Sequence, residues 1–265
     1  MNEIDKLKKA LNFLTSHIAG ASELAEIATK GCIVLDTNHI DNPETVLIQE
    51  QNQTDNQLEL SQKMLDRFKT HNLNNLEVGR LYERYIGYLW EKENWKVTYK
   101  GIVDGLADMG RDLICIKGNE HKIIQAKCWS KYTPIREKHV YQLFASATHY
   151  RMELRNAYKL SYGRSKAKAM MKELDIKAVI CSTNDLSETA QEVVNYLQIL
   201  SHQKVKLSKE YSMVKCNINS TNHKKVYHLP FNPAYDTIII GNIQGEQYVH
   251  TVQDAEKLGF RRAGT

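Results

Sequence analysis

Residues 79–130 read GRLYERYIGYLWEKENWKVTYKGIVDGLADMGRDLICIKGNEHKIIQAKCWS, and they contain the clearest secondary-structure signals of the chain. Apolar side chains recur at helical spacing from Leu76 to about Asn94, which predicts an amphipathic helix. WKVTYKG (95–101) then alternates as a strand does, and a glycine-rich loop follows. Two β-rich runs come next, DLICIKG (112–118) and HKIIQAKC (121–128), and the Gly-Asn-Glu between them predicts a hairpin.

The chain that follows this stretch continues with alternating helix and strand patterns. Residues 137–160 return to helical spacing, and IKAVICST (176–183) is a continuous apolar run, as in strands covered on both faces. SETAQEVVNYLQI (187–199) opens with a serine N-cap and predicts another helix. Together these patterns predict an α/β domain over residues 76–204, with a mixed sheet flanked by helices.

The two ends of the chain differ in character from this central domain. Residues 1–75 predict a helical arm interrupted by a polar connector, and the arm could pack, dimerise or contact a protein partner. From residue 205 onward, short β-like pieces and one short helix predict a small α+β C-terminal module.

The composition is that of an ordinary water-soluble protein. The 265 residues carry a formal charge of +5 and include 42% hydrophobic and 25% charged residues. No apolar run approaches the roughly 20 residues that span a bilayer, and the N-terminal residues lack the apolar core of a secretory signal. The five cysteines form no CxxC pair, so neither a disulfide framework nor a zinc spacing is indicated. We therefore expect a cytoplasmic protein without a membrane partner.

The predicted hairpin brings three chemically useful side chains together. Gln125 and Lys127 are two residues apart on one strand and therefore share a face. If the connecting loop has an even number of residues, Asp112 lies opposite one of them and shares that face. Loops of Gly118-Asn119 or Asn119-Glu120 both satisfy this condition. A carboxylate, an amide oxygen and an ammonium group would then lie within roughly 5–8 Å of one another.

This trio suits a hard divalent cation. Mg²⁺ prefers oxygen ligands, which Asp112, the Gln125 side chain and the Ala126 carbonyl could supply. Lys127 could orient the attacking water and balance negative charge at phosphorus, and Glu83 on the preceding helix could reach the same site. Each residue also has a plainer interpretation, as a solvated ion pair or a surface helix residue.

Order and spacing together resemble a known family. The Mrr-like restriction endonucleases, in the PD-(D/E)xK nuclease superfamily, have a helix with Glu in a G-x-x-Y/F-E context, a glycine-rich turn into G-x-D-L, and a strand ending Q-x-K. Residues 79–83, 110–113 and 125–127 of this chain match those elements. ICSTNDLSETAQEVVNYLQI (180–199) resembles the strand, polar turn and helix that follow in that family. Gln125 stands where most of the superfamily has an acidic residue, as is common in the Mrr-like branch, so a metal would depend more on Asp112 and Glu83.

The resemblance covers roughly residues 79–200 and implies a restriction-endonuclease-like fold with Mg²⁺- or Mn²⁺-dependent hydrolysis of DNA phosphodiester bonds. The implied role is restriction or other defence against foreign DNA. The implied mechanism has Asp112, Gln125 and Glu83 hold the metal while Lys127 positions the water. The alternative is a non-catalytic nucleic-acid-binding or assembly protein that retains the nuclease fold. Cutting both strands of a duplex commonly needs two active sites, which would make a homodimer plausible.

Positively charged residues downstream of the hairpin are candidates for holding DNA, because lysine and arginine neutralise phosphates with little regard to sequence. A solvated helix face is the competing interpretation of most of these cations. Separately, Gln142 on the helix after the hairpin could face the candidate metal site or pack at the edge of the core. The candidate DNA contacts are Trp129, Lys131, Arg136, Arg151, Arg155, Lys159, Arg164, Lys166 and Lys168.

The C-terminal module resembles a second pattern. VYHLPFNPAYD (226–236) and EQYVHTVQDAEKLGFRRAG (246–264) are similar to the metal-binding module of the Ada DNA-repair protein and to similar tails attached to nucleases. That pattern places cysteines after the YHLP-like stretch and near the chain end. Here Phe231, Asn232 and residues 261–263 stand instead, so we expect a metal-free tail used for packing, DNA contact or partner contact.

Overall fold

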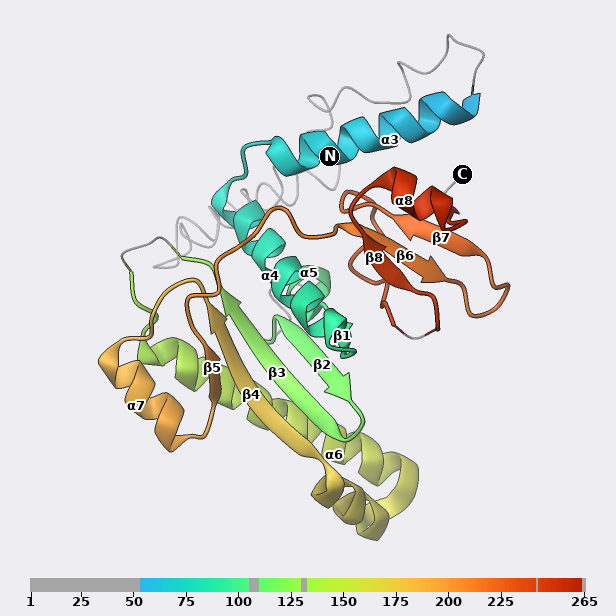
Figure 1. The fold of residues 1–265 in the computed structure, drawn as a ribbon. Coiled ribbons are helices and arrows are strands. Elements are labelled where there is room, and N and C mark those ends of the chain that lie inside the picture. Colours follow the sequence, from blue (N-terminus) through green and yellow to red (C-terminus); the bar gives the residue numbers. More distant parts are fainter. Residues whose placement is uncertain (1–52, 105–109, 130–132, 242, 264–265) are drawn as a thin grey trace, which may run out of the picture. The chain divides into compact units, whose positions relative to one another are not determined.

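The computed structural model describes residues 53–104, 110–129, 133–241 and 243–263 (Figure 1). Contacts divide the chain into one unit of residues 1–54 and a second of residues 55–265. The predicted helices and polar connector before residue 53 lie outside the described residues. The described helices include none with the length and apolar composition needed to cross a bilayer.

The first sheet has the strand order β1-β2-β3-β4-β5. Strands β1 (Lys96–Thr98), β2 (Leu113–Lys117) and β3 (Glu120–Lys127) are antiparallel neighbours. Strands β4 (Asp175–Ser182) and β5 (Leu200–His202) then add in parallel to β3. The sheet is therefore mixed, and the predicted α/β class is confirmed.

The predicted hairpin is the β2–β3 pair. Lys117 pairs with Glu120, so the connecting loop is Gly118-Asn119, one of the two even-length loops expected from the sequence. Gly118 has a φ of 59°, a conformation that glycine adopts without the steric cost of a Cβ. The turn chemistry thus fixes the register on which the candidate site depends.

Helices cover both faces of this sheet. Helix α4 (Asn75–Lys92) begins with a capping box between Asn74 and Glu77, and it packs on the face that presents residues such as Leu113 and Ile124. Helices α6 (Glu137–Glu173) and α7 (Glu188–Tyr196) pack on the opposite face. Strand β1 ends at Thr98, earlier than the predicted end at residue 101, and a short helix, α5 (Lys100–Asp104), extends from there into the predicted glycine-rich loop. Helix α6 continues well past residue 160, where the sequence pattern predicted its end, and reverses at Gly163.

The C-terminal residues form a second sheet of order β8-β6-β7-β9. Its elements are β6 (Val214–Ile218), β7 (Lys225–His228), β8 (Gln247–Val249), helix α8 (Val252–Lys257) and β9 (Arg261–Arg262). Helix α3 (Gln53–Thr70) shares its hydrophobic core, in which Leu65, Val252 and Phe260 are buried. Gln62 also accepts a hydrogen bond from the Val252 amide at 2.9 Å. The described part of the predicted arm therefore packs on the C-terminal module.

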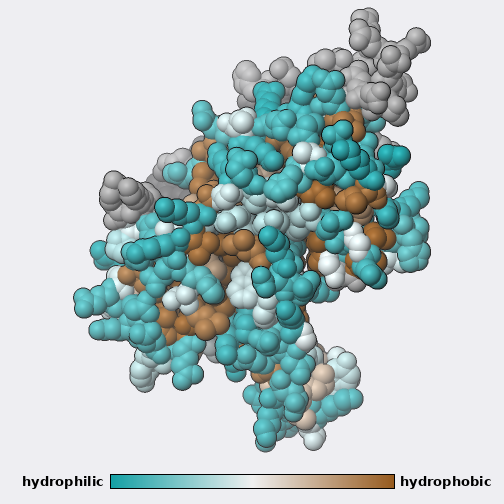
Figure 2. Space-filling model, viewed as in Figure 1, coloured by the Kyte–Doolittle hydropathy of each residue, from teal (hydrophilic) through white to brown (hydrophobic). Residues whose placement is uncertain are grey.

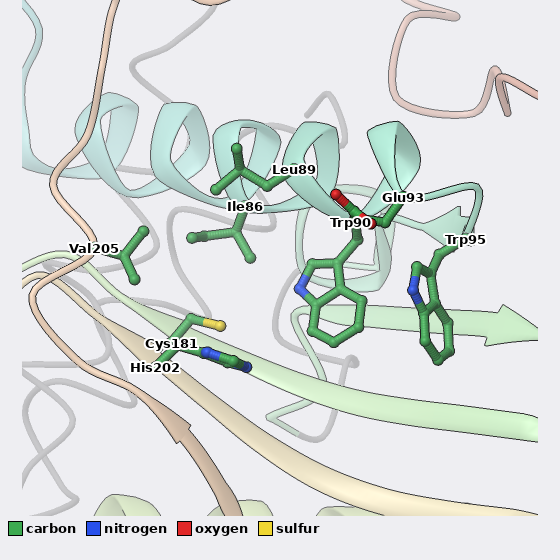
Figure 3. A pocket seen from close by; sticks show the side chains of 8 residues that line it. All are labelled: Ile86, Leu89, Trp90, Glu93, Trp95, Cys181, His202 and Val205. Atoms are coloured by element: carbon green, nitrogen blue, oxygen red, sulfur yellow. The ribbon is translucent and has the colours of Figure 1, made fainter.

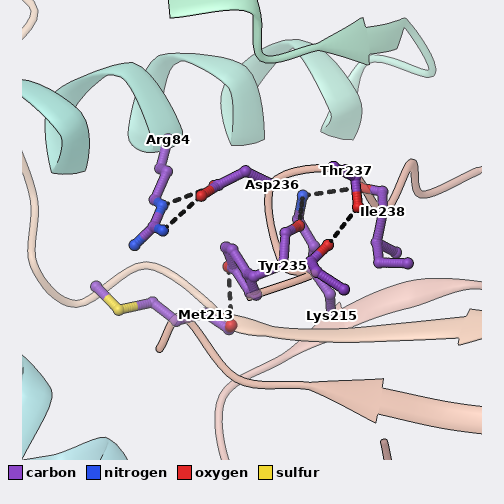
Figure 4. Close-up of polar contacts among 8 residues, drawn as sticks. Arg84, Met213, Lys215, Tyr235, Asp236, Thr237 and Ile238 are labelled. Atoms are coloured by element: carbon purple, nitrogen blue, oxygen red, sulfur yellow. Dashed lines mark hydrogen bonds and ion pairs between the residues drawn. The ribbon is translucent and has the colours of Figure 1, made fainter. Parts of the chain in front are cut away.

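A buried polar network joins the module to α4 (Figure 4). Arg84 donates two hydrogen bonds to Asp236, at 2.8 and 2.7 Å. The fully buried Lys215 ammonium donates to the Tyr235 and Ile238 carbonyls, at 3.1 and 2.9 Å, and lies 4.5 Å from the Tyr99 ring centroid. Because Arg84 directly follows Glu83, these contacts hold the helix that carries a candidate metal ligand.

Candidate active site

Asp112 and Gln125 meet where β2 begins and β3 nears its end. The last pair of this ladder is Leu113 with Ile124, so Asp112 and Gln125 are the residues that directly adjoin this pair on the two strands. Lys127, two residues beyond Gln125, lies on the same face of β3. Asp112 is 7% exposed and Gln125 is fully buried. The even-length loop is as expected, and the convergence of the three side chains on one site stays a prediction.

The Asp112 carboxylate is held by the neighbouring strand. Its Oδ2 accepts a hydrogen bond of 2.7 Å from the Ala126 backbone amide. This contact ties the carboxylate to the residue between Gln125 and Lys127. Its position is therefore set by the strand pairing rather than by a free rotamer.

The Gln125 side chain has one satisfied end and one unsatisfied end. Its Nε2 donates to Gln142 Oε1 on α6 at 3.3 Å. Its buried Oε1 accepts no hydrogen bond from any described residue. A buried amide oxygen without a partner is costly, so this atom is suited to accept a cation or a water. Of the two interpretations of Gln142, the structure supports contact with the site.

Gly101 allows Glu83 to approach the start of β2. The Gly101 amide donates to the Asp112 carbonyl at 2.9 Å. A Cβ at position 101 would lie 2.7 Å from Glu83 Oε2 and 3.1 Å from Asp112 Cα. Both groups therefore crowd the space that a larger side chain would fill. The structure brings Glu83, from α4, to the same corner of the sheet as Asp112.

His139 on α6 is a neighbour of Lys127 that sequence reasoning did not select. Burial lowers the pKa of His139, and the nearby positive charges of Lys127 and Lys138 lower it further. Its buried Nε2 has no hydrogen-bond partner among the described residues. The ring packs edge-on against Trp129, with centroids 4.9 Å apart. The sequence signal that could have identified His139 is its position three residues before Gln142, because residues at this spacing lie on one side of a helix.

The donor types present are those that a hard cation prefers. Two carboxylates, from Asp112 and Glu83, and the open amide oxygen of Gln125 are oxygen ligands of the kind Mg²⁺ prefers. Among the residues that the structure describes, no group of three or more His, Cys, Asp or Glu is placed to hold a metal ion. Any metal at this corner would therefore rely on the amide and on backbone or water oxygens beside the two carboxylates.

The candidate DNA contacts lie in several places. Trp129 is fixed near the end of β3, because its amide donates to Thr183 Oγ1 at 3.0 Å. Arg136 is the exposed N-cap residue of α6, and Lys131 lies outside the described residues. Arg151 donates to the Ile176 carbonyl at 2.5 Å, so this cation is partly used within the fold. The other candidates are exposed on the second half of α6: Arg155, Lys159, Arg164, Lys166 and Lys168.

An aromatic pocket of about 380 Å³ lies between α4 and strands β4 and β5, and sequence reasoning did not select it. Figure 3 shows Trp90 and Trp95 side by side, with Cys181 and His202 to the left of Trp90. The two indole rings meet edge-on, with centroids 5.0 Å apart. Burial raises the pKa of Cys181 to about 12, with a further contribution from the Asp112 charge. The thiol is therefore protonated at neutral pH and is not a nucleophile.

Comparisons with protein-family models, with curated proteins and with solved structures find no match to this chain. The function is accordingly inferred from the chemistry of the site itself.

Proposed function

We propose that the chain is a metal-dependent endonuclease that hydrolyses phosphodiester bonds in DNA. Two observations support the proposal: the Asp112 carboxylate is held by the backbone amide of Ala126, and the buried Oε1 of the adjacent Gln125 has no partner among the described residues. The order of α4, three antiparallel strands, α6, β4 and α7 also agrees with the restriction-endonuclease-like fold that the sequence resemblance implies.

In this proposal each residue has a separate task. Asp112, Gln125 and Glu83 hold the cation, with Ala126 supplying backbone oxygen. A bound Mg²⁺ or Mn²⁺ would polarise the phosphate and lower the pKa of an attacking water. Lys127 orients that water and balances the charge that develops at phosphorus. Gln142 holds the amide of Gln125, so that its oxygen is directed away from the helix.

The proposed biological role is restriction or defence against foreign DNA in the cytoplasm, by a chain that could act as a homodimer. A non-catalytic nucleic-acid-binding protein is the competing assignment. The two differ in one measurable property, which is product formation that requires both a divalent metal and Lys127.

The test incubates supercoiled, linear, single-stranded and modified DNA with the full chain, with and without Mg²⁺ or Mn²⁺. Lys127→Ala is compared with Lys96→Ala, a matched control on an exposed position of β1 in the same sheet. We expect cleavage by the wild type and by the control, and none by Lys127→Ala. Metal-independent binding without any product would instead support the non-catalytic assignment.

A further inference from the structure

The reversal of α6 at Gly163 creates a surface that the proposed metal site does not use. Gly163 has φ 79° and ψ 167°, a conformation essentially restricted to glycine. The helix therefore divides into a first leg, residues 137–162, and a second leg, residues 164–173. Ala167 on the second leg is 2% exposed, which indicates that this leg packs back on the fold rather than extending into solvent.

A groove of about 450 Å³ lies between the two legs. Four of its lining residues are cationic, Asn156 adds an amide, and no carboxylate lines it. No ion pair joins these cations to an acidic side chain in the described part of the chain. The lower end of the molecule in Figure 2, where Figure 1 places the end of α6, is mainly hydrophilic with some pale and tan residues. The four cations are Arg155, Lys159, Arg164 and Lys168.

This concentration of like charge is unfavourable without a counter-ion. Arg155 and Lys159 are four residues apart on one leg, and Arg164 and Lys168 are four apart on the other, so each pair repels. The reversal at Gly163 then brings both pairs to one groove. A ligand with several negative charges would relieve this repulsion, and guanidinium groups match the geometry of phosphate oxygens. Asn156 could donate to the same oxygens.

The groove lies away from the candidate active site. Gln142 contacts Gln125 near the carboxyl end of β3, whereas Tyr150 contacts His121 near its amino end. Helix α6 therefore runs antiparallel to β3, and the groove lies beyond the amino end of that strand. The 13 residues from Gln142 to Arg155 span about 20 Å at the rise of an α-helix. That length corresponds to about six base pairs of duplex.

We propose that this groove between the legs of α6 binds successive backbone phosphates of duplex DNA, about half a helical turn from the bond that is cut. The inference rests on the proposed function for the location of the cut, but phosphate binding in the groove requires no metal. It predicts that a productive substrate extends at least about six base pairs to one side of the scissile phosphate.

The test measures DNA binding in EDTA, where cleavage cannot contribute, by fluorescence anisotropy of a labelled 24-base-pair duplex over a range of salt. The variant Arg155→Ala/Lys168→Ala removes one exposed cation from each leg. The control Lys224→Ala/Lys257→Ala removes two exposed cations from the C-terminal module. We expect the groove variant to lose at least tenfold in affinity at 100 mM salt. Its slope of log affinity against log salt should also fall by about 1.8, or about 0.9 per phosphate contact.

Equal affinity and slope for the groove variant and the control would overturn the inference. Tripolyphosphate provides a second arm, because a free polyphosphate shares the same chemistry. If the groove variant loses tripolyphosphate binding while its affinity for duplex is unchanged, the DNA assignment is wrong. Because phosphate binding in the groove requires no metal, a failure of DNA cleavage with intact groove-dependent binding would count against the proposed function alone.

Discussion

Gly101→Ala tests whether Glu83 belongs to the site. The added Cβ would lie 2.7 Å from Glu83 Oε2, a separation that requires one of the two to move. The carboxylate is the end of a flexible side chain, so it is the group that retreats. The contact of 3.1 Å with Asp112 Cα also presses on the start of β2. The substitution therefore displaces two candidate ligands at once.

The expected cost in stability is small and the expected cost in activity is large. Overpacking of this kind costs about 1 kcal/mol when a flexible group can move, which lowers the Tm by roughly 2–4 °C in a domain of this size. Displacing a catalytic group by about 1 Å can reduce the rate by about 100-fold. We therefore expect cleavage to fall by about 10- to 100-fold and Mn²⁺ affinity, measured by electron paramagnetic resonance, to weaken in parallel.

Gly79→Ala is the matched control. Gly79 lies on α4, the helix that carries Glu83, and nothing lies within 4 Å of its added Cβ. We expect unchanged activity and a stability that is equal to wild type or higher by about 0.5–1 kcal/mol. In a double-mutant cycle, adding Glu83→Gln to Gly101→Ala should cause little further loss, since Gly101→Ala has already displaced the Glu83 carboxylate. Wild-type rate and Mn²⁺ affinity in Gly101→Ala, or fully additive losses, would refute this reasoning.

Three further predictions concern the amide ligand, the buried ammonium and pH. Gln125→Glu should retain cleavage and bind Mn²⁺ at least tenfold more tightly than the wild type, whereas Gln125→Met should lose both cleavage and Mn²⁺ binding. Equal Mn²⁺ affinity in the wild type and the two variants would show that the Gln125 oxygen is not a ligand. Lys215→Met should lower the free energy of unfolding, measured with urea, by about 3–5 kcal/mol, because it leaves Glu91 buried without its positive neighbour. Adding Glu91→Gln to Lys215→Met should restore about 1 kcal/mol or more of that free energy. Burial lowers the pKa of His121, His139 and His228 below the ordinary 6.5. The unfolded state therefore binds more protons than the folded state, and the free energy of unfolding should fall as the pH drops below about 6.5. Urea unfolding curves that coincide at pH 7.5 and pH 5.5 would contradict this prediction.

The central fold and its hairpin register were predictable because short-range signals determine them. Gly118-Asn119 lies between two strands of alternating pattern, and the parity of the loop fixes which side chains share a face. Ser187 at the start of α7 was likewise predictable, since its hydroxyl accepts a hydrogen bond from the Ala190 amide.

The features that were not predicted depend on a local backbone conformation or on contacts distant in sequence. The reversal of α6 depends on a φ value at Gly163 that composition does not reveal, because an isolated glycine is also tolerated within a straight helix. The packing of α3 on the C-terminal module joins residues nearly 200 positions apart, as in the bond between Gln62 and Val252. The domain boundaries at residues 75 and 205 stay predictions.

The most direct measurement of the central claim is the single-turnover rate of plasmid cleavage as a function of Mg²⁺ concentration for the wild type and Asp112→Asn. The asparagine keeps an oxygen that can accept the Ala126 amide hydrogen bond, so the strand pairing should persist and the Tm should be unchanged. We expect a wild-type rate that rises and saturates with Mg²⁺, and a rate for Asp112→Asn at least about 100-fold lower at every concentration. Cleavage by Asp112→Asn at the wild-type rate, with the same Mg²⁺ dependence, would contradict the assignment of Asp112 as a metal ligand.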